Sequence, residues 1–297
     1  MSKEKTDLND DQTPLLRTQG DVWKYLHSLS GVPEEKLDLF ETALALSSLF
    51  TPGISIDKYR QHLKKMAETV KEWMAVMCEE GVPDNAETRA DVLSKVMFQE
   101  FGYQGDSQDY DNLENANLIR VIDRRKGLPV SLGILYLKMA DLLGWDMQGL
   151  SFPGHFIVSL TQEADRLILD PFRLGQKLGA PELRQILKAV IGEYAELSAD
   201  YYQPVGNREI LIRLENNIKT RLIEQEEYHK AIEVVDAMLA FAPEEYRLYL
   251  DSGVLRAKTE QLPEAISALE TYSSLTPYPE EQYEADKLIQ QILYEMD

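Results

Sequence analysis

A repeat near the C-terminus constrains the fold of this chain most strongly. Ala231 recurs as Ala265 within the same local pattern, and Pro243 recurs as Pro277, in both cases 34 residues later. A fixed period of this length indicates a unit of two antiparallel helices that stacks on its own copies, with small residues where the helices pack. We therefore expect the last third of the chain to be helical and repetitive.

A 34-residue period with a proline after the second helix of each unit is the tetratricopeptide signature. Residues 208–297 have room for about one and a half to two such units and one preceding helix. An array this short cannot bury its own faces, so we expect it to dock on the rest of the chain or on a partner. We predict an all-α tetratricopeptide-like domain over residues 201–297.

A second informative stretch runs from residue 124 to residue 170. Gly127 and Pro129 favour a turn, and the leucines that follow recur at the three- and four-residue steps of a helix. Ser131 therefore lies at or near a helix N-terminus, where unpaired N–H groups and the helix dipole stabilise negative charge. Gly144 is expected to end this helix in the left-handed conformation.

Two short apolar segments follow this helix, residues 155–160 and 166–170, and the four residues 161–164 between them read as a hairpin loop. In that register His155 lies directly opposite Asp170, and opposed residues share one face of a sheet. The spacing thus predicts a hydrogen bond between His155 and Asp170.

A carboxylate that orients an imidazole, which lies near a hydroxyl at a helix N-terminus, is the arrangement of a catalytic triad. Ser131 would be the nucleophile, His155 the base and Asp170 the residue that fixes the tautomer. The simpler alternatives stay open. A serine at a helix start is more often a capping residue, and a histidine on a strand is often a satisfied core residue.

Three blocks of this chain resemble the bacterial Sir-B-type invasion-regulator family: Asn115–Leu132 (NANLIRVIDRRKGLPVSL), Phe152–Phe156 (FPGHF) and Asp170–Phe172 (DPF). The resemblance implies an α+β fold. It implies a papain- or transglutaminase-like domain with an antiparallel sheet over residues 21–200, followed by the helical repeats. Enzymes of this fold place cysteine where Ser131 stands, and a thiol is far easier to activate than a hydroxyl.

Polar residues before the turn are candidate binding residues. Asn115 and Asn117 close a loop that we expect to rim the site, and Arg120, Arg124 and Arg125 cluster just after it. A solvated helix face is the simpler interpretation of the arginines. The alternative is a clamp for an anion or carboxylate, because arginine forms bidentate pairs with such groups.

The net charge restricts the class of partner, and the cysteine content restricts the cross-links and the compartment. A net charge of −20 repels phosphate backbones, so we expect no direct nucleic-acid binding and a protein or peptide partner that is, if anything, basic. Cys78, the one cysteine, excludes a disulfide framework and fits the cytoplasm. We expect it to be a core thiol. No metal site, cofactor or membrane segment is predicted, and residues 1–20 are expected to form a disordered tail.

Three functions follow. The favoured one is a regulatory protein that binds a protein or peptide through a non-catalytic transglutaminase-like domain and its repeats. The alternative is a serine-dependent acyl-transfer enzyme, a hydrolase or amidase, using Ser131, His155 and Asp170. The third is a transcriptional regulator, for which the net charge of −20 makes direct DNA contact unfavourable.

Overall fold

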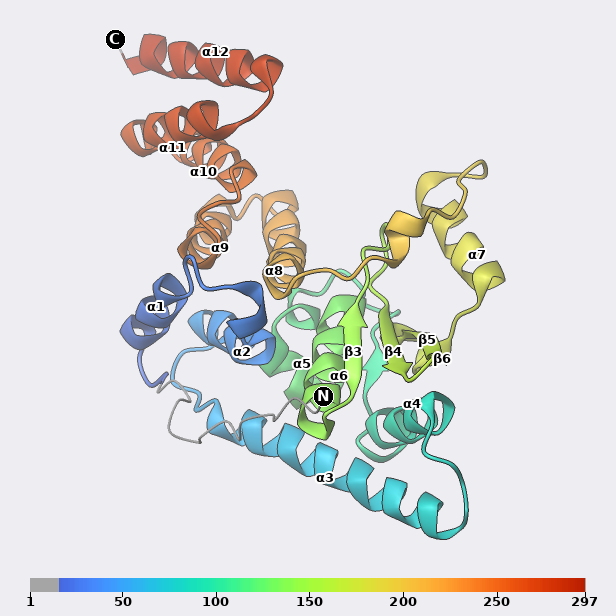
Figure 1. The fold of residues 1–297 in the computed structure, drawn as a ribbon. Helices are drawn as coiled ribbons and strands as arrows, with labels where there is room; N and C mark the ends of the chain where they lie inside the picture. Colours follow the sequence, from blue (N-terminus) through green and yellow to red (C-terminus); the bar gives the residue numbers. More distant parts are fainter. Residues whose placement is uncertain (1–15, 297) are drawn as a thin grey trace.

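The computed structural model describes residues 16–296, and the chain runs through a mixed α/β body into a rising stack of helices (Figure 1). The helices of the body are α1 (Gln19–Ser28), α2 (Leu39–Leu49), α3 (Asp57–Glu79), α4 (Ala86–Ser94), α5 (Leu118–Arg124), α6 (Pro129–Leu143) and α7 (Ala180–Ile191). A π-helix, Lys95–Glu100, prolongs α4.

The sheet is antiparallel, as predicted, with its strands in the order β3 (Asp146–Gly149), β4 (Val158–Gln162), β5 (Asp165–Asp170) and β6 (Gln176–Lys177). A small parallel pair, β1 (Gln104–Gly105) and β2 (Lys126–Gly127), lies beside the start of α6. The α+β class is therefore confirmed.

The predicted hairpin register is wrong by two residues. Strand β4 continues to Gln162, which faces Asp165, so the loop consists of Glu163 and Ala164 alone. Glu163 adopts a φ of 54°, the left-handed conformation that suits a two-residue hairpin. Strand β4 begins at Val158, so His155 lies before the strand rather than within it. In the observed register His155 does not face Asp170 across the ladder.

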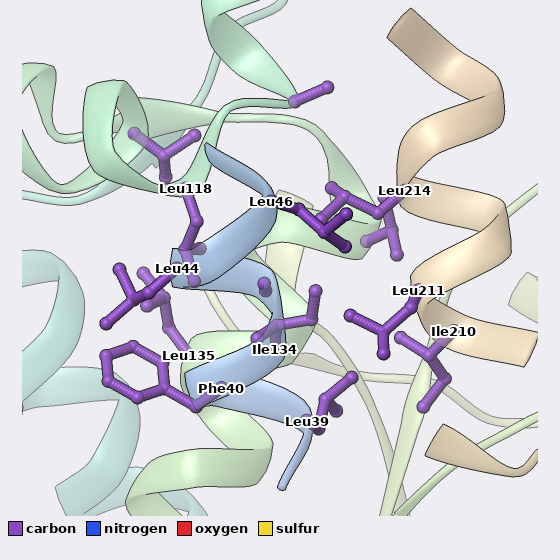
Figure 2. Close-up of a cluster of buried hydrophobic side chains, with 14 of the residues drawn as sticks. Leu39, Phe40, Leu44, Leu46, Leu118, Ile134, Leu135, Ile210, Leu211 and Leu214 are labelled. Atoms are coloured by element: carbon purple, nitrogen blue, oxygen red, sulfur yellow. The ribbon is translucent and has the colours of Figure 1, made fainter. Parts of the chain in front are cut away.

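Helix α6 is central to the first domain. Pro129 occupies its first turn and Gly144 ends it at a φ of 72°, as predicted. Gly133 permits close packing of α6 on the segment before β4, since a Cβ there would lie 2.3 Å from the Phe156 ring. Figure 2 shows Ile134 of α6 in the same apolar cluster as Leu46 of α2.

The C-terminal helices are α8 (Asn207–Glu224), α9 (Tyr228–Phe241), α10 (Arg247–Lys258), α11 (Leu262–Leu275) and α12 (Pro279–Met296). They match the predicted repeat, since α9 and α11 carry the recurring alanines at equivalent positions.

The start of the array docks on the body. Leu211 and Leu214 of α8 point toward α2 in Figure 2 and belong to the same core as α1, α6 and α9. Arg208 also donates hydrogen bonds to the carbonyls of Val32 (2.7 Å) and Phe241 (2.8 Å). Helices α11 and α12 bury a separate small cluster and rise away from the body (Figure 1).

Two further expectations need correction. Residues 1–15 of the predicted tail lie outside the described residues, but Leu16 is buried and α1 begins at Gln19, capped by the Thr18 side chain. Cys78 is exposed rather than buried, because it lies in the last turn of the long helix α3, on the side that faces solvent.

Candidate functional site

His155 and Asp170 form the predicted hydrogen bond. The distance from His155 Nε2 to Asp170 Oδ2 is 2.8 Å, and the side chain of His155 is 15% exposed while that of Asp170 is fully buried. His155 reaches Asp170 from the turn before β4. Gly154 has a φ of 66° in this turn, and a Cβ there would lie 2.4 Å from Val190.

Several other groups hold the Asp170 carboxylate in place. Oδ1 accepts hydrogen bonds from the backbone N–H groups of Phe172 (2.9 Å) and Arg173 (3.3 Å). The Arg173 Nε lies 3.7 Å from Oδ2. The carboxylate therefore ends β5, caps the short turn that follows, and orients the imidazole of His155.

Ser131 lies in the first turn of α6, as predicted, but its hydroxyl is fully buried. It donates a 2.7 Å hydrogen bond to the backbone carbonyl of Asn115. Among residues 16–296 no hydrogen bond joins Ser131 to His155. The structure therefore brings His155 and Asp170 together and directs the serine hydroxyl into the protein interior.

Asn115 and Asn117 have structural partners. The Asn115 side chain is buried, donates to the Asp109 carbonyl (2.7 Å) and accepts from Arg124 (3.1 Å). Asn117 caps α5 and also donates to the Ser47 carbonyl (3.1 Å). Both residues order the loop before α6, and neither presents its amide to an open surface.

Arg124 and Arg125 are held by partners within the protein. Arg124 forms an ion pair with the buried Asp106 (3.2 Å) and a second one with Glu114 (3.3 Å). Arg125 is left-handed, with a φ of 61°, and donates to the Tyr103 hydroxyl (2.6 Å). These partners occupy the groups that an anion clamp would need.

His62 also accepts from Arg125 (2.8 Å). Burial and the neighbouring charge of Arg125 lower the pKa of His62 to about 4, so its ring is neutral at physiological pH. Arg120 is more exposed than Arg124, and its Nε lies 3.8 Å from Glu114.

Two aromatic rings extend in a row from His155. The Phe172 ring packs against His155 with centroids 6.4 Å apart, and against Tyr110 with centroids 5.8 Å apart. Arg221 of α8 lies over the Tyr110 ring, at 5.7 Å. Sequence reasoning missed these residues, because α8 is brought to this edge only by tertiary packing and no local pattern marks it.

Within the described residues, no group of three or more His, Cys, Asp or Glu side chains is placed to hold a metal ion. In the same part of the chain, no helix is both long enough and apolar enough to cross a bilayer.

Comparison with known proteins identifies both halves of the chain. Residues 57–216, more than half of the sequence, match the model of the transglutaminase-like superfamily. The chain belongs to this superfamily. Residues 218–290 match a tetratricopeptide repeat model, so the transglutaminase-like domain is followed by helical repeats, as the resemblance implied. The two matches meet within α8.

Bacterial relatives are similar to this chain over most of their length. A "UPF0162 protein" of Vibrio cholerae is 31% identical over 222 residues, covering 74% of this chain and 80% of the relative. A "UPF0162 protein" of Xylella fastidiosa is 27% identical, covering 84% and 88%. Human "F-box only protein 21" is 28% identical over 172 residues, covering 54% of this chain and 26% of that protein.

Proposed function

We propose that this chain is a regulatory binding protein. In this proposal the transglutaminase-like domain is not catalytic and binds a protein or peptide partner, and the tetratricopeptide-like helices provide a second contact surface. The repeats support an interaction role, since stacked helical pairs present extended surfaces to partners.

One observation carries the non-catalytic part of the proposal. The Ser131 hydroxyl is buried and donates to the Asn115 carbonyl, while His155 makes its hydrogen bond with Asp170. A nucleophilic serine needs its base within hydrogen-bond distance and an open approach for substrate. The hydroxyl of Ser131 has neither, so its described role is to fasten the loop before α6.

The character of the partner follows from charge. The chain carries a net charge of −20, which attracts basic segments over long range and speeds their encounter. Glu280, Glu281 and Glu284 gather at the start of α12 and add to this potential. A basic protein or peptide in the cytoplasm is the partner class that we infer, with no cofactor required.

Partner capture from cells tests this proposal. The wild-type protein and S131A, each tagged at the same terminus, should recover the same partners in the same amounts by in-cell crosslinking and mass spectrometry. Circular dichroism and a thermal melt of S131A provide the control for folding. A folded S131A that loses a partner completely would contradict the non-catalytic function.

A second function keeps one specific observation in its favour. The 2.8 Å contact between His155 and Asp170 is the base and orienting carboxylate that a serine-dependent hydrolase or amidase requires. That function needs Ser131 to leave the Asn115 carbonyl and turn toward His155. Covalent labelling of Ser131 distinguishes the two functions.

A further inference from the structure

Helix α8 has one buried face and one polar face. Leu211 and Leu214 pack into the common core. On the other face, Arg213, Asn217 and Thr220 recur at three- and four-residue steps and line an open groove of about 510 Å³. We call this site the α8 groove. None of its residues was predicted from the sequence to be a site residue.

Arg213 is a half-buried cation whose acidic neighbour on α8 is Glu209, one helical turn away. Its Nη1 donates only a long 3.5 Å hydrogen bond to the Phe152 carbonyl, and its guanidinium lies 5.6 Å from the Phe156 ring. Among residues 16–296 no carboxylate lies within ion-pair distance of Arg213. Burial lowers the pKa of this guanidinium. A partly desolvated cation of this kind gains strongly from a carboxylate that binds it through two hydrogen bonds.

Arg221 also lines the groove, and its Nε–H is a covered donor that has no hydrogen-bond partner among the described residues. Arg221 pairs with Asp111 at 3.0 Å, but the Asp111 side chain is 85% exposed. The Arg221 side chain itself is 9% exposed, and it also donates to the carbonyls of Asn217 (2.9 Å) and Tyr110 (3.3 Å).

We propose that the α8 groove binds the carboxylate of a peptide, with Arg213 as its bidentate partner. This inference rests on the proposed partner-binding function and specifies one chemical group of that partner. The planar fork of a guanidinium matches the two oxygens of a carboxylate, and Glu209 borders the same groove.

Contacts between aromatic side chains connect the α8 groove with His155. Both arginines of the groove lie close enough to Tyr110 to oppose the rise that burial causes in its pKa. Tyr110 contacts Phe172, which contacts His155. The Phe152 carbonyl that Arg213 contacts belongs to the turn that carries His155. A peptide anchored at Arg213 therefore lies beside the surface that surrounds His155.

Nuclear magnetic resonance of arginine Nε–H groups in the full-length protein tests this site with small probes. N-acetylglycine supplies a C-terminal carboxylate, N-acetylglutamate amide a side-chain carboxylate, N-acetylglycinamide neither, and inorganic phosphate a dianion. We expect either carboxylate to shift the Arg213 signal in a saturable way at millimolar concentration, and the more effective of the two identifies its source in the partner. N-acetylglycinamide should have no effect.

Matched variants assign the binding. R213M, which keeps the stem on Phe156, should abolish the shifts of the other groove residues, whereas R184M, on the exposed face of α7, should preserve them. E209Q should tighten carboxylate binding by roughly threefold, the effect of one nearby like charge in water.

Three results would overturn the inference: no saturable shift up to about 50 mM carboxylate, a concentration that detects even a very weak fragment; tighter binding of phosphate than of either carboxylate; or unchanged binding in R213M. Because the probes need no cellular partner and no change at Ser131, failure here would leave the partner-capture test of the proposed function unaffected.

Discussion

The Ser131 hydroxyl donates to the backbone carbonyl of Asn115 at 2.7 Å, in the interior of the transglutaminase-like domain. The same carbonyl also accepts from the Leu128 N–H at 3.0 Å. These two hydrogen bonds tie the loop before α6 to the first turn of that helix.

The first prediction concerns access to position 131. In S131C the introduced thiol should react with Ellman's reagent at least ~100-fold more slowly than Cys78, the factor that corresponds to an opening free energy of about 2.8 kcal/mol. Cys78 is exposed and serves as the internal control. Both thiols should react at once in denaturant. Two fast thiols in the native protein would show that position 131 is open.

The second prediction concerns the carboxylate of Asp170. D170A removes the acceptor of two backbone N–H groups and of His155, so the free energy of unfolding should fall by about 2–4 kcal/mol. Urea denaturation measures this change. D165A, at the exposed start of the same strand, should cost under ~0.5 kcal/mol. Equal losses in the two variants would mean that the Asp170 contacts do not stabilise the fold.

The contact between His155 and Asp170 was predicted correctly, but the strand register used to predict it is wrong. A four-residue loop was predicted because Thr161 and Gln162 are polar, yet both belong to β4. The strand extends because its polar residues lie on the partly exposed end of the sheet, where alternation of apolar and polar residues no longer marks the strand. His155 meets Asp170 through tertiary packing of the turn before β4, which no cross-strand rule describes.

Some features of the fold depend on nearby residues, and others depend on residues separated in the chain. The 34-residue repeat and the limits of α6 follow from periodicity and from Pro129 and Gly144, so the sequence was enough to predict them. Arg124 pairs with Asp106, 18 residues before it, and Arg213 contacts the Phe152 carbonyl, 61 residues before it. Those pairings could not be read from the sequence, because nothing near either arginine identifies its partner.

The third prediction concerns Glu215, a fully buried carboxyl group of α8 whose Oε2 has no hydrogen-bond partner among the described residues. Burial raises the pKa of Glu215 from 4.5 to about 8. The folded protein therefore holds a proton that the unfolded chain releases, so stability should decline as pH rises from about 4.5 to about 8.

The loss attributable to Glu215 is on the order of 5 kcal/mol at most. E215Q should remove this decline and be more stable than the wild type at pH 8.5. E224Q, which replaces an exposed carboxylate of the same helix, should leave the profile unchanged. Urea denaturation across the pH range measures both variants, and identical profiles for E215Q and the wild type would contradict the prediction.

The fourth prediction concerns His62 and acid. Burial, followed by the charge of Arg125, lowers the pKa of His62 from 6.5 to about 4. As the pH falls, His62 binds a proton in the unfolded chain at a higher pH than in the folded protein. The free energy of unfolding should therefore fall as pH drops from about 6.5 to about 4.

H62Q keeps an acceptor for Arg125 but cannot titrate, so it should lose less stability than the wild type between pH 6.5 and pH 4, by about 2 kcal/mol. H229Q, at an exposed position in α9, should behave like the wild type. Thermal melts at closely spaced pH values measure this difference. A wild-type decline that H62Q leaves intact would assign the acid sensitivity to other groups.

The central claim is that Ser131 is not a nucleophile, and covalent labelling tests it most directly. Wild type, S131A and H155A are incubated with several fluorophosphonate probes, and adducts are measured by intact mass and peptide mapping. We predict no adduct on Ser131 in the wild type. An adduct on Ser131 that is absent from S131A and suppressed in H155A would contradict the claim and establish a serine-dependent acyl-transfer site.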